Sequence, residues 1–173
     1  MARSKSDISN SAIRIFLQDV GTFYDQERGF DPFRPTVMQK DQLLEYFGCQ
    51  CCFCNVEIDR KTLSQDHLIP MNKTHLGLHA WGNVVPCCQR CNNEKQQKPW
   101  QVFIEEKAHI DDVERRKSLI NSFVGDMRYD PALSLHKYAD SLYEDVGAVA
   151  TTLINLRYKQ AEEAIKLLMT SNL

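Results

Sequence analysis

The sequence predicts an α+β protein in which a small strand–loop–strand–helix unit lies between two helical segments. Three observations predict this fold. Apolar residues follow helical spacing up to residue 47 and again beyond residue 108. The stretch from Cys49 to Cys91 breaks that spacing and contains all seven cysteines of the 173-residue chain. Two short runs of β-compatible residues, bounded by turn formers, lie within the same stretch.

The first predicted segment, residues 1–47, is expected to be helical. Apolar residues recur every three or four positions over 11–24, and a second helix is expected over 38–47, with Gly48 as its stop. Residues 29–35 read GFDPFRP between them, and two prolines require a turn or an extended connector. We expect Phe30 and Phe33 to anchor this connector to the core rather than to stack on a nucleic acid.

The second predicted segment, residues 48–99, holds the two strands and one helix. A tight turn is expected at 51–54, and short strands within 62–70 and 82–86. A helix is expected from residue 92 and should end before Pro99. Five side chains could contact phosphate but are more often solvated. Three lie in the loop at 71–81, between the strands, and two near the helix: Lys73, His75 and His79, and Arg90 and Lys95.

The third predicted segment, residues 100–173, is again helical. One helix is expected over 108–123, ended by Gly125, and Asp130-Pro131 is a suitable start for another. Apolar residues then continue mostly at spacings of three and four as far as residue 168, with Gly147 as a possible kink or break. We expect this stripe to be core rather than a dimer surface.

The cysteine spacing predicts a structural zinc site. Each short Cys-x-x-Cys turn delivers two sulfurs to one side of a tetrahedral ion, so two such turns complete its ligand set. An odd number of cysteines, in a chain without an export signal, favours a metal over disulfides. In the first half of the Cys49–Cys91 stretch, two alternative pairs have the right spacing, Cys51 with Cys54 or Cys49 with Cys52. In its second half one pair does, Cys88 with Cys91. Cys87 is then expected to be a buried thiol.

A second, reactive site is predicted beside the zinc. Asp66 and Asn92 offer oxygen ligands for a hard cation, and the imidazole of His67 can take a proton at physiological pH. Each has a simpler interpretation: Asp66 as a surface turn residue, His67 as a structural or zinc-bound histidine, and Asn92 as a helix cap. The occurrence of all three between the cysteine pairs favours the reactive site.

Composition and charge limit the classes of protein. The chain is 43% hydrophobic and 25% charged, which is typical of a folded soluble protein. It has no apolar run long enough to span a membrane and no apolar signal segment near its N-terminus, so we expect no membrane partner and a cytoplasmic location. The net charge of −2 is not typical of a nucleic-acid-binding protein. Any binding of a polyanion should therefore be confined to the mildly basic central segment.

Four pieces of the central stretch carry a family resemblance: CCFC at 51–54, DHLIP at 66–70, WGNVV at 81–85 and CQRCNNEK at 88–95. Together they resemble the HNH endonuclease family. Order, spacing and identity agree across all four. Within the family they resemble members with a four-cysteine zinc, including McrA-like restriction enzymes and junction resolvases of the endonuclease VII type. The phenylalanine before Cys54 fits the family pattern and favours Cys51 with Cys54 as the first pair.

The resemblance implies a ββα-metal HNH core with a structural four-cysteine zinc, flanked by N-terminal and C-terminal helices. It implies that His67 is the general base, that Asp66 and Asn92 hold a catalytic cation, and that Asn83 pins the loop that positions His67. Asparagine stands where the last histidine of the H-N-H pattern would be, as in the resolvase-like members. Two oxygen ligands favour Mg²⁺ or Mn²⁺ over a late transition metal.

The predicted function is therefore metal-dependent hydrolysis of DNA phosphodiester bonds, with a restriction or other genome-defence role on family grounds. The alternatives are a non-catalytic zinc module that binds nucleic acid or protein, and a nuclease subunit whose target is chosen by a partner protein. A homodimer would suit double-strand cutting, because each active site cuts one strand, and a monomer would suit nicking.

Overall fold

The computed structural model describes residues 5–130 and 135–170. The central unit is an antiparallel pair of short strands, β1 (Leu63–His67) and β2 (Val84–Cys88), followed by helix α3 (Gln89–Lys95). In the register of the pair, Asp66 lies opposite Val85 and His67 opposite Val84. The confirmed order of strand, loop, strand and helix makes the fold class α+β, as predicted.

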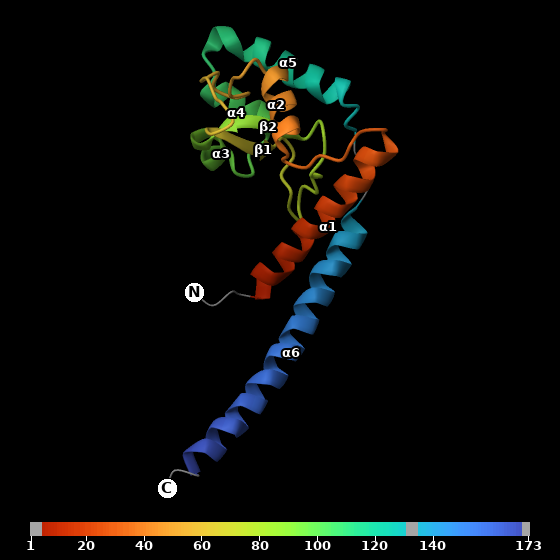
Figure 1. Ribbon diagram of the computed structural model, residues 1–173, viewed down its shortest axis with the longest axis vertical. Coiled ribbons are helices and arrows are strands. Elements are labelled where there is room, and N and C mark those ends of the chain that lie inside the picture. The colour runs from red at the N-terminus through yellow and green to blue at the C-terminus, as the bar shows by residue number, and fades with distance from the viewer. Residues whose placement is uncertain (1–4, 131–134, 171–173) are drawn as a thin grey trace.

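Helices surround this unit and contribute many of the side chains of its core. Helix α2 (Val37–Tyr46) lies against β2, and helices α4 (Trp100–Lys107) and α5 (Val113–Asp126), joined by the short 3₁₀ helix η1 (Ile110–Asp112), cover the rest (Figure 1). The core is built from side chains contributed by all three predicted segments, among them Phe33, Leu43, Phe47, Phe53, Val85, Trp100, Phe103, Ile120 and Phe123. Burial of these side chains supplies the main stabilisation, at about 1.5–3 kcal/mol for each large apolar residue.

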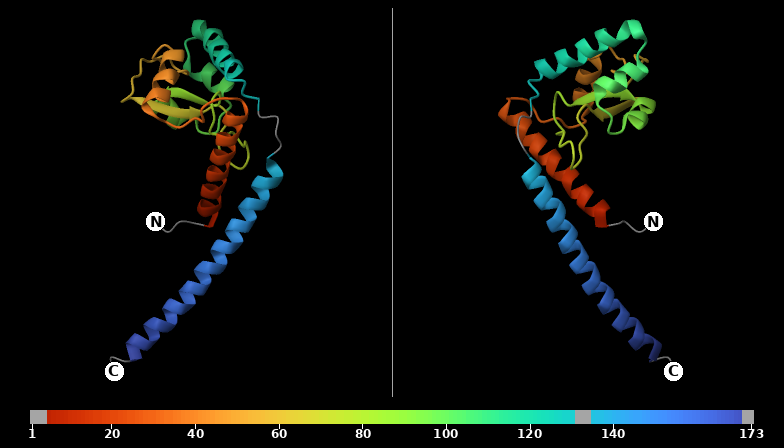
Figure 2. Two further views of the ribbon diagram at one scale, coloured as in Figure 1. Left: turned by 45° about the vertical axis from the view of Figure 1, so that its right-hand side comes forward. Right: turned by 180° about the vertical axis from the view of Figure 1, so that it is seen from behind.

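The two remaining helices form an arm beside the central unit. Helix α1 (Lys5–Glu27) packs along the first part of α6 (His136–Thr170) through a second apolar cluster that includes Ile13, Leu17 and Ala139. At 35 residues, α6 is about 52 Å long. It continues well past the start of α1, as both further views show (Figure 2).

Several predicted boundaries were wrong. Helix α1 covers residues 5–27 rather than 11–24, α3 begins at residue 89 rather than 92, and β2 lies two residues beyond the predicted run. Within the helical third segment no separate helix was predicted over residues 100–107, because Pro99 reads as a stop. Here it is the residue before the first turn of α4, and Trp100, Phe103 and Ile104 are buried on one face. The helix predicted over 108–123 is η1 followed by α5.

Helix α6 is continuous through Gly147, so the helix does not break at this residue. The packing gives a reason: a Cβ atom at Gly147 would lie 3.2 Å from the hydroxyl of Ser9, so the glycine allows α1 to approach closely. Pro131, part of the expected helix start, lies outside the described residues. The apolar stripe is core only where α1 covers it. Further on, side chains that are 48–67% exposed continue it: Val149, Leu153, Ile154, Leu156, Tyr158 and Ile165.

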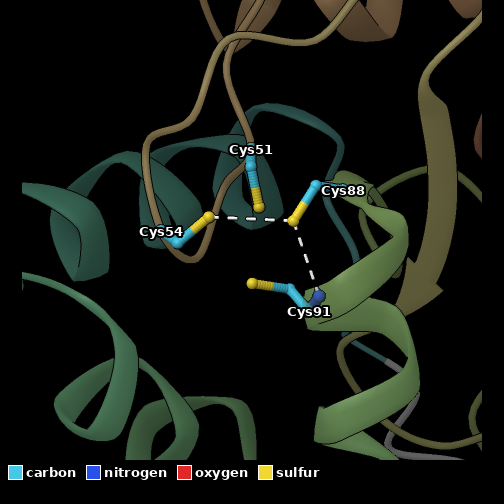
Figure 3. A group of neighbouring side chains, drawn as sticks. All are labelled: Cys51, Cys54, Cys88 and Cys91. Carbon is cyan, nitrogen blue, oxygen red and sulfur yellow. Dashed lines mark hydrogen bonds between the residues drawn. The ribbon is translucent and has the colours of Figure 1, made fainter.

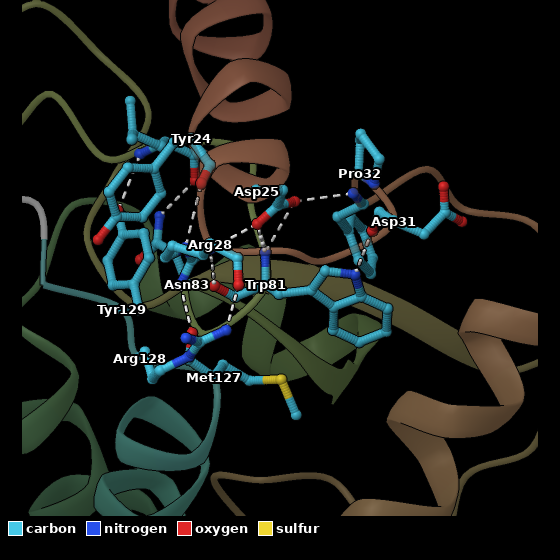
Figure 4. A network of polar contacts seen from close by, with 12 residues as sticks. Tyr24, Asp25, Arg28, Asp31, Pro32, Trp81, Asn83, Met127, Arg128 and Tyr129 are labelled. Carbon is cyan, nitrogen blue, oxygen red and sulfur yellow. Dashed lines mark hydrogen bonds and ion pairs between the residues drawn. The ribbon is translucent and has the colours of Figure 1, made fainter.

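Phe33 anchors the connector between α1 and α2, as predicted, and is 2% exposed. A buried polar network holds this connector against the loop that precedes β2 (Figure 4). The carboxylate of Asp25 accepts hydrogen bonds from the backbone N–H of Phe33 at 2.8 Å and of Trp81 at 3.2 Å, and it pairs with the guanidinium of Arg28. Arg28 also donates to the carbonyl of Trp81. No described helix is both long enough and apolar enough to cross a membrane.

Candidate functional site

Four cysteine sulfurs converge between the turn at 51–54 and the start of α3 (Figure 3). The Sγ atoms of Cys51, Cys54, Cys88 and Cys91 all lie within 4.8 Å of one another. The sulfurs of Cys54 and Cys88 are 3.8 Å apart, and a tetrahedral zinc with Zn–S bonds of about 2.3 Å requires sulfur–sulfur separations of roughly 3.8 Å. The cluster is therefore compatible with a structural zinc.

Local geometry explains how the sulfurs meet. The amide of Cys51 donates to the carbonyl of Val56, and the amide of Asn55 donates back to the carbonyl of Cys51, so the chain makes a closed turn. Asn55 lies in the left-handed region, with φ of 65°, a conformation that asparagine tolerates better than most residues. On the other side, Cys88 precedes the first turn of α3 and its sulfur accepts from the amide of Cys91 at 3.5 Å.

The other three cysteines lie outside the cluster. Cys49 is exposed, and Cys52 and Cys87 are fully buried. Burial raises the pKa of both buried thiols well above the usual range, so they stay protonated. Of the two pairings that spacing left open, the structure brings together Cys51 and Cys54, and Cys87 is the buried thiol that was predicted.

The residues of the predicted reactive site line one cleft of about 630 Å³. Asp66 and His67 reach it from the end of β1, and Asn92 from α3. The amide nitrogen of Asn92 donates to the hydroxyl of Ser64 at 2.8 Å, which fixes the amide and leaves its oxygen as an acceptor. Helix α1 also lines the cleft, through Arg14.

Asp66 has a buried cation beside it. The Nζ atom of Lys95, whose side chain is 0% exposed, lies 2.8 Å from Oδ2 of Asp66 and donates to the backbone carbonyl of His67 at 2.7 Å. Burial raises the pKa of Asp66, because it disfavours the charged form, and the charge of Lys95 opposes that effect. Helix α3 therefore holds the end of β1 through an ion pair and a hydrogen bond.

The ring of His67 contacts a second histidine. Its Nε2 atom lies 3.1 Å from Nδ1 of His79, which is in the loop before β2. Burial, with smaller contributions from His79, Lys95 and Arg14, lowers the pKa of His67 to about 3. The imidazole is therefore neutral at physiological pH, which is the state in which a histidine can accept a proton.

Asn83 lies behind the cleft rather than in it and is fully buried. Its side-chain oxygen accepts from the amide of Ile69 at 2.8 Å, and its nitrogen donates to the carbonyls of Ile69 and Leu78 at 3.1 and 2.8 Å. These bonds join both ends of the loop that follows His67. These contacts are compatible with the loop-pinning role that the family resemblance implies for Asn83.

The sequence interpretation missed or underrated one residue that lines the cleft, Arg14, and two that contact its lining residues, Lys95 and His79. Lys95 is buried in an ion pair rather than solvated, and His79 contacts His67 rather than only solvent. Arg14 was read only as part of a helix. Arg14 lies in an amphipathic helix with no local signal, whereas Lys95 stands three positions after Asn92 and so lies on a neighbouring position of α3. That spacing could have placed Lys95 near the cleft.

Comparisons with known proteins agree with this geometry. Residues 51–107 match the model of a family described as HNH endonuclease, a range that includes both cysteine pairs, both strands, α3 and α4. Over 62 residues the chain is 34% identical to the CRISPR-associated endonuclease Cas9 of Actinomyces naeslundii. These 62 residues are 36% of this chain and 6% of that protein. The chain thus spans a small part of its relative's length. The resemblance seen in the sequence is confirmed: residues 51–107 of this chain match the HNH endonuclease family.

Proposed function

We propose that this protein is a metal-dependent endonuclease that hydrolyses phosphodiester bonds of DNA. One observation carries the proposal: Asp66, His67 and Asn92 line a single cleft beside the four-cysteine cluster, within the segment that matches the family. A module that only binds nucleic acid has no need of a carboxylate, a neutral imidazole and an amide oxygen around one cavity.

The zinc has a structural role in this proposal. Four thiolates fill a tetrahedral coordination sphere, whereas a catalytic zinc keeps one position open for water or substrate. Cys51 and Cys54 come from one turn and Cys88 and Cys91 from the start of α3, so the ion ties the turn to the helix that carries Asn92 and Lys95.

A second cation, Mg²⁺ or Mn²⁺, would be held by Asp66 and Asn92. The donor set fits such an ion, because it consists of a buried carboxylate and an amide oxygen whose nitrogen is already engaged by Ser64. When bound, a divalent cation stabilises negative charge on the scissile phosphate and on the leaving oxygen.

The base and the phosphate contact are supplied by side chains of the protein. His67 is the general base: as a neutral imidazole it takes the proton from the attacking water, and the hydrogen bonds of Asn83 keep its loop in place. Arg14, the cationic side chain that α1 contributes to the cleft, binds a phosphate of the strand being cut. The products are a 5′-phosphate and a 3′-hydroxyl, as in the family that the sequence resembles.

The relative's name supports this chemistry through the word endonuclease. We include in the proposal a restriction or genome-defence role, which rests on the resemblance alone.

The exposed half of α6 favours a partner, and we propose that the partner is a second copy of the chain. Apolar side chains at Val149, Leu153 and Leu156 lie at spacings of four and three residues, the pattern of helices that pair. A dimer would bring two clefts to one DNA molecule, so that each cuts one strand. A targeting protein at this surface, with the chain as its nuclease subunit, is the alternative.

The test is cleavage of supercoiled plasmid by the zinc-loaded protein with Mg²⁺ or Mn²⁺. We expect cutting by the wild type and by the control His136→Ala, whose residue is exposed at the start of α6. His67→Ala and Asp66→Ala should be inactive with unchanged zinc content. Equal cutting by His67→Ala would refute the assigned base. Binding of DNA without cutting by any variant, under either cation, would favour the non-catalytic zinc module.

A further inference from the structure

The contact between two histidines at the cleft decides which ring nitrogen of His67 can act. Nε2 of His67 and Nδ1 of His79 are 3.1 Å apart, within hydrogen-bond distance. No other described residue hydrogen-bonds the remaining nitrogen, Nδ1, of His67. Resting on the proposed nuclease function, we propose that His79 is a positioning residue that accepts a hydrogen bond from Nε2–H of His67 and thereby leaves Nδ1 unprotonated to take the proton of the attacking water.

The direction of this hydrogen bond matters because a neutral imidazole carries one N–H and one lone pair. If Nε2 of His67 holds the proton, its lone pair is on Nδ1 and the ring can accept a proton there. If His79 donated instead, Nδ1 of His67 would carry the proton and could not act as a base. His79 therefore orients His67 in the way that the carboxylate of a catalytic triad orients its histidine base. Here the acceptor is a neutral imidazole rather than a carboxylate.

His79 is itself held by residues outside the segment that matches the family. The ring of Phe33 meets it edge to face, with centroids 5.2 Å apart and planes at 73°, and Phe33 packs in the same way on Trp81. Helix α1 approaches the backbone of His79 so closely that a Cβ atom at Gly21 would lie 2.5 Å from its carbonyl oxygen.

The buried network strengthens this support. Asp25 binds the backbone amides of both Phe33 and Trp81, so it fixes the connector and the loop of His79 relative to each other. The N-terminal segment is therefore more than a scaffold. It places the ring of His79 beside the proposed base, His67, which lies in the segment that matches the family. The contact of Phe33 restrains rotation of the His79 ring.

Two variants separate the hydrogen bond from the packing. His79→Phe keeps a flat ring against Phe33 and removes the acceptor. His79→Asn returns an oxygen to the place of the lost Nδ1 atom. His136→Asn, at an exposed histidine on α6, is the matched control. The first readout is the pair of ¹⁵N chemical shifts of the His67 ring in zinc-loaded protein without Mg²⁺ or Mn²⁺, because these shifts tell a protonated nitrogen from an unprotonated one.

We expect Nε2 of His67 to be protonated and Nδ1 unprotonated in the wild type and in His79→Asn, and a mixture of both tautomers in His79→Phe. The kcat for plasmid cleavage should fall about 10- to 100-fold in His79→Phe, as is typical when an outer partner of a site is lost. KM, melting temperature and zinc content should be unchanged, and His79→Asn should recover most of kcat.

Protonation of Nδ1 in the wild type, or a wild-type kcat in His79→Phe, would overturn the proposal. If His79→Phe fails to fold, two other results test the proposal: the tautomer of His67 in the wild type, and the kcat of His79→Asn compared with that of His79→Leu. The proposal requires a higher kcat in His79→Asn, which has an acceptor, than in His79→Leu, which has none. The tautomer is measured without any cleavage. A wild type that cuts no DNA would therefore refute the nuclease function, while the ¹⁵N shifts would still accept or reject the hydrogen bond.

Discussion

The ammonium group of Lys95 lies 2.8 Å from Oδ2 of Asp66, and the Lys95 side chain is entirely buried. The carboxylate proposed to hold a divalent cation therefore already has a fixed positive charge beside it. This arrangement keeps the end of β1 in place whether or not a metal is bound, and it means that an incoming cation shares Asp66 with Lys95.

Replacing Lys95 by methionine should lower the free energy of unfolding by about 3–5 kcal/mol, because it leaves the Asp66 carboxylate buried without its partner. The measurement is urea denaturation of zinc-loaded protein. Lys98→Met is the control, since Lys98 forms an ion pair at the surface and its loss should change little. The double variant Asp66→Asn with Lys95→Met should recover part of the loss. Equal effects of Lys95→Met and Lys98→Met would contradict the buried ion pair.

Zinc should bind one per chain and should depend on the clustered cysteines alone. Cys54→Ser is expected to lose the ion and to lower the melting temperature, because a structural zinc site contributes directly to folding. Cys49→Ser, which changes an exposed cysteine outside the cluster, should keep both zinc and stability. Metal content by mass spectrometry and thermal unfolding check this. A full complement of zinc in Cys54→Ser would refute the assigned ligand set.

The sequence could predict the parts of the site that depend on short spacings. Cys51 and Cys54 are near neighbours, Asp66 and His67 are adjacent, and Asn92 follows a cysteine whose partner is three residues away. Such spacings bring ligands together with little help from the rest of the fold. The two strands, and helix α3 that follows them, can be predicted from the same kind of local signal.

The remainder depends on tertiary packing. His79 meets His67 only because Asn83 closes the loop between them and Gly21 lets α1 pack on it. Lys95 is buried although lysine is nearly always at the surface, since its partner Asp66 is on a different element. Helix α4 was not predicted as a separate element of the helical third segment, because a proline can begin a helix as well as end one. Helical spacing in α6 shows an apolar face but does not tell which part α1 covers.

Arg14 should contribute to DNA binding and not to the chemical step. Arg14→Ala is expected to raise KM with kcat nearly unchanged, and to reduce the slope of log affinity against log salt by about 1, the effect of losing one phosphate contact. Arg157→Ala removes an exposed arginine on the distant half of α6 and serves as the control. Binding isotherms at several salt concentrations test this. An unchanged slope in Arg14→Ala would exclude a phosphate contact.

The exposed half of α6 should make the chain a dimer. Most of the stability of a helix in a protein comes from packing of its apolar face, so the exposed half of α6 gains most from a partner. Sedimentation analysis of the wild type should show a dimer, and the double variant Leu153→Glu with Leu156→Glu should be a monomer, because it places charges on the apolar face. Asn155→Glu changes an exposed polar residue between them and should remain dimeric. The dimeric wild type should convert plasmid directly to linear product, whereas the monomeric variant should mainly nick it. A monomeric wild type at its highest soluble concentration would refute self-association and leave this face for a targeting protein.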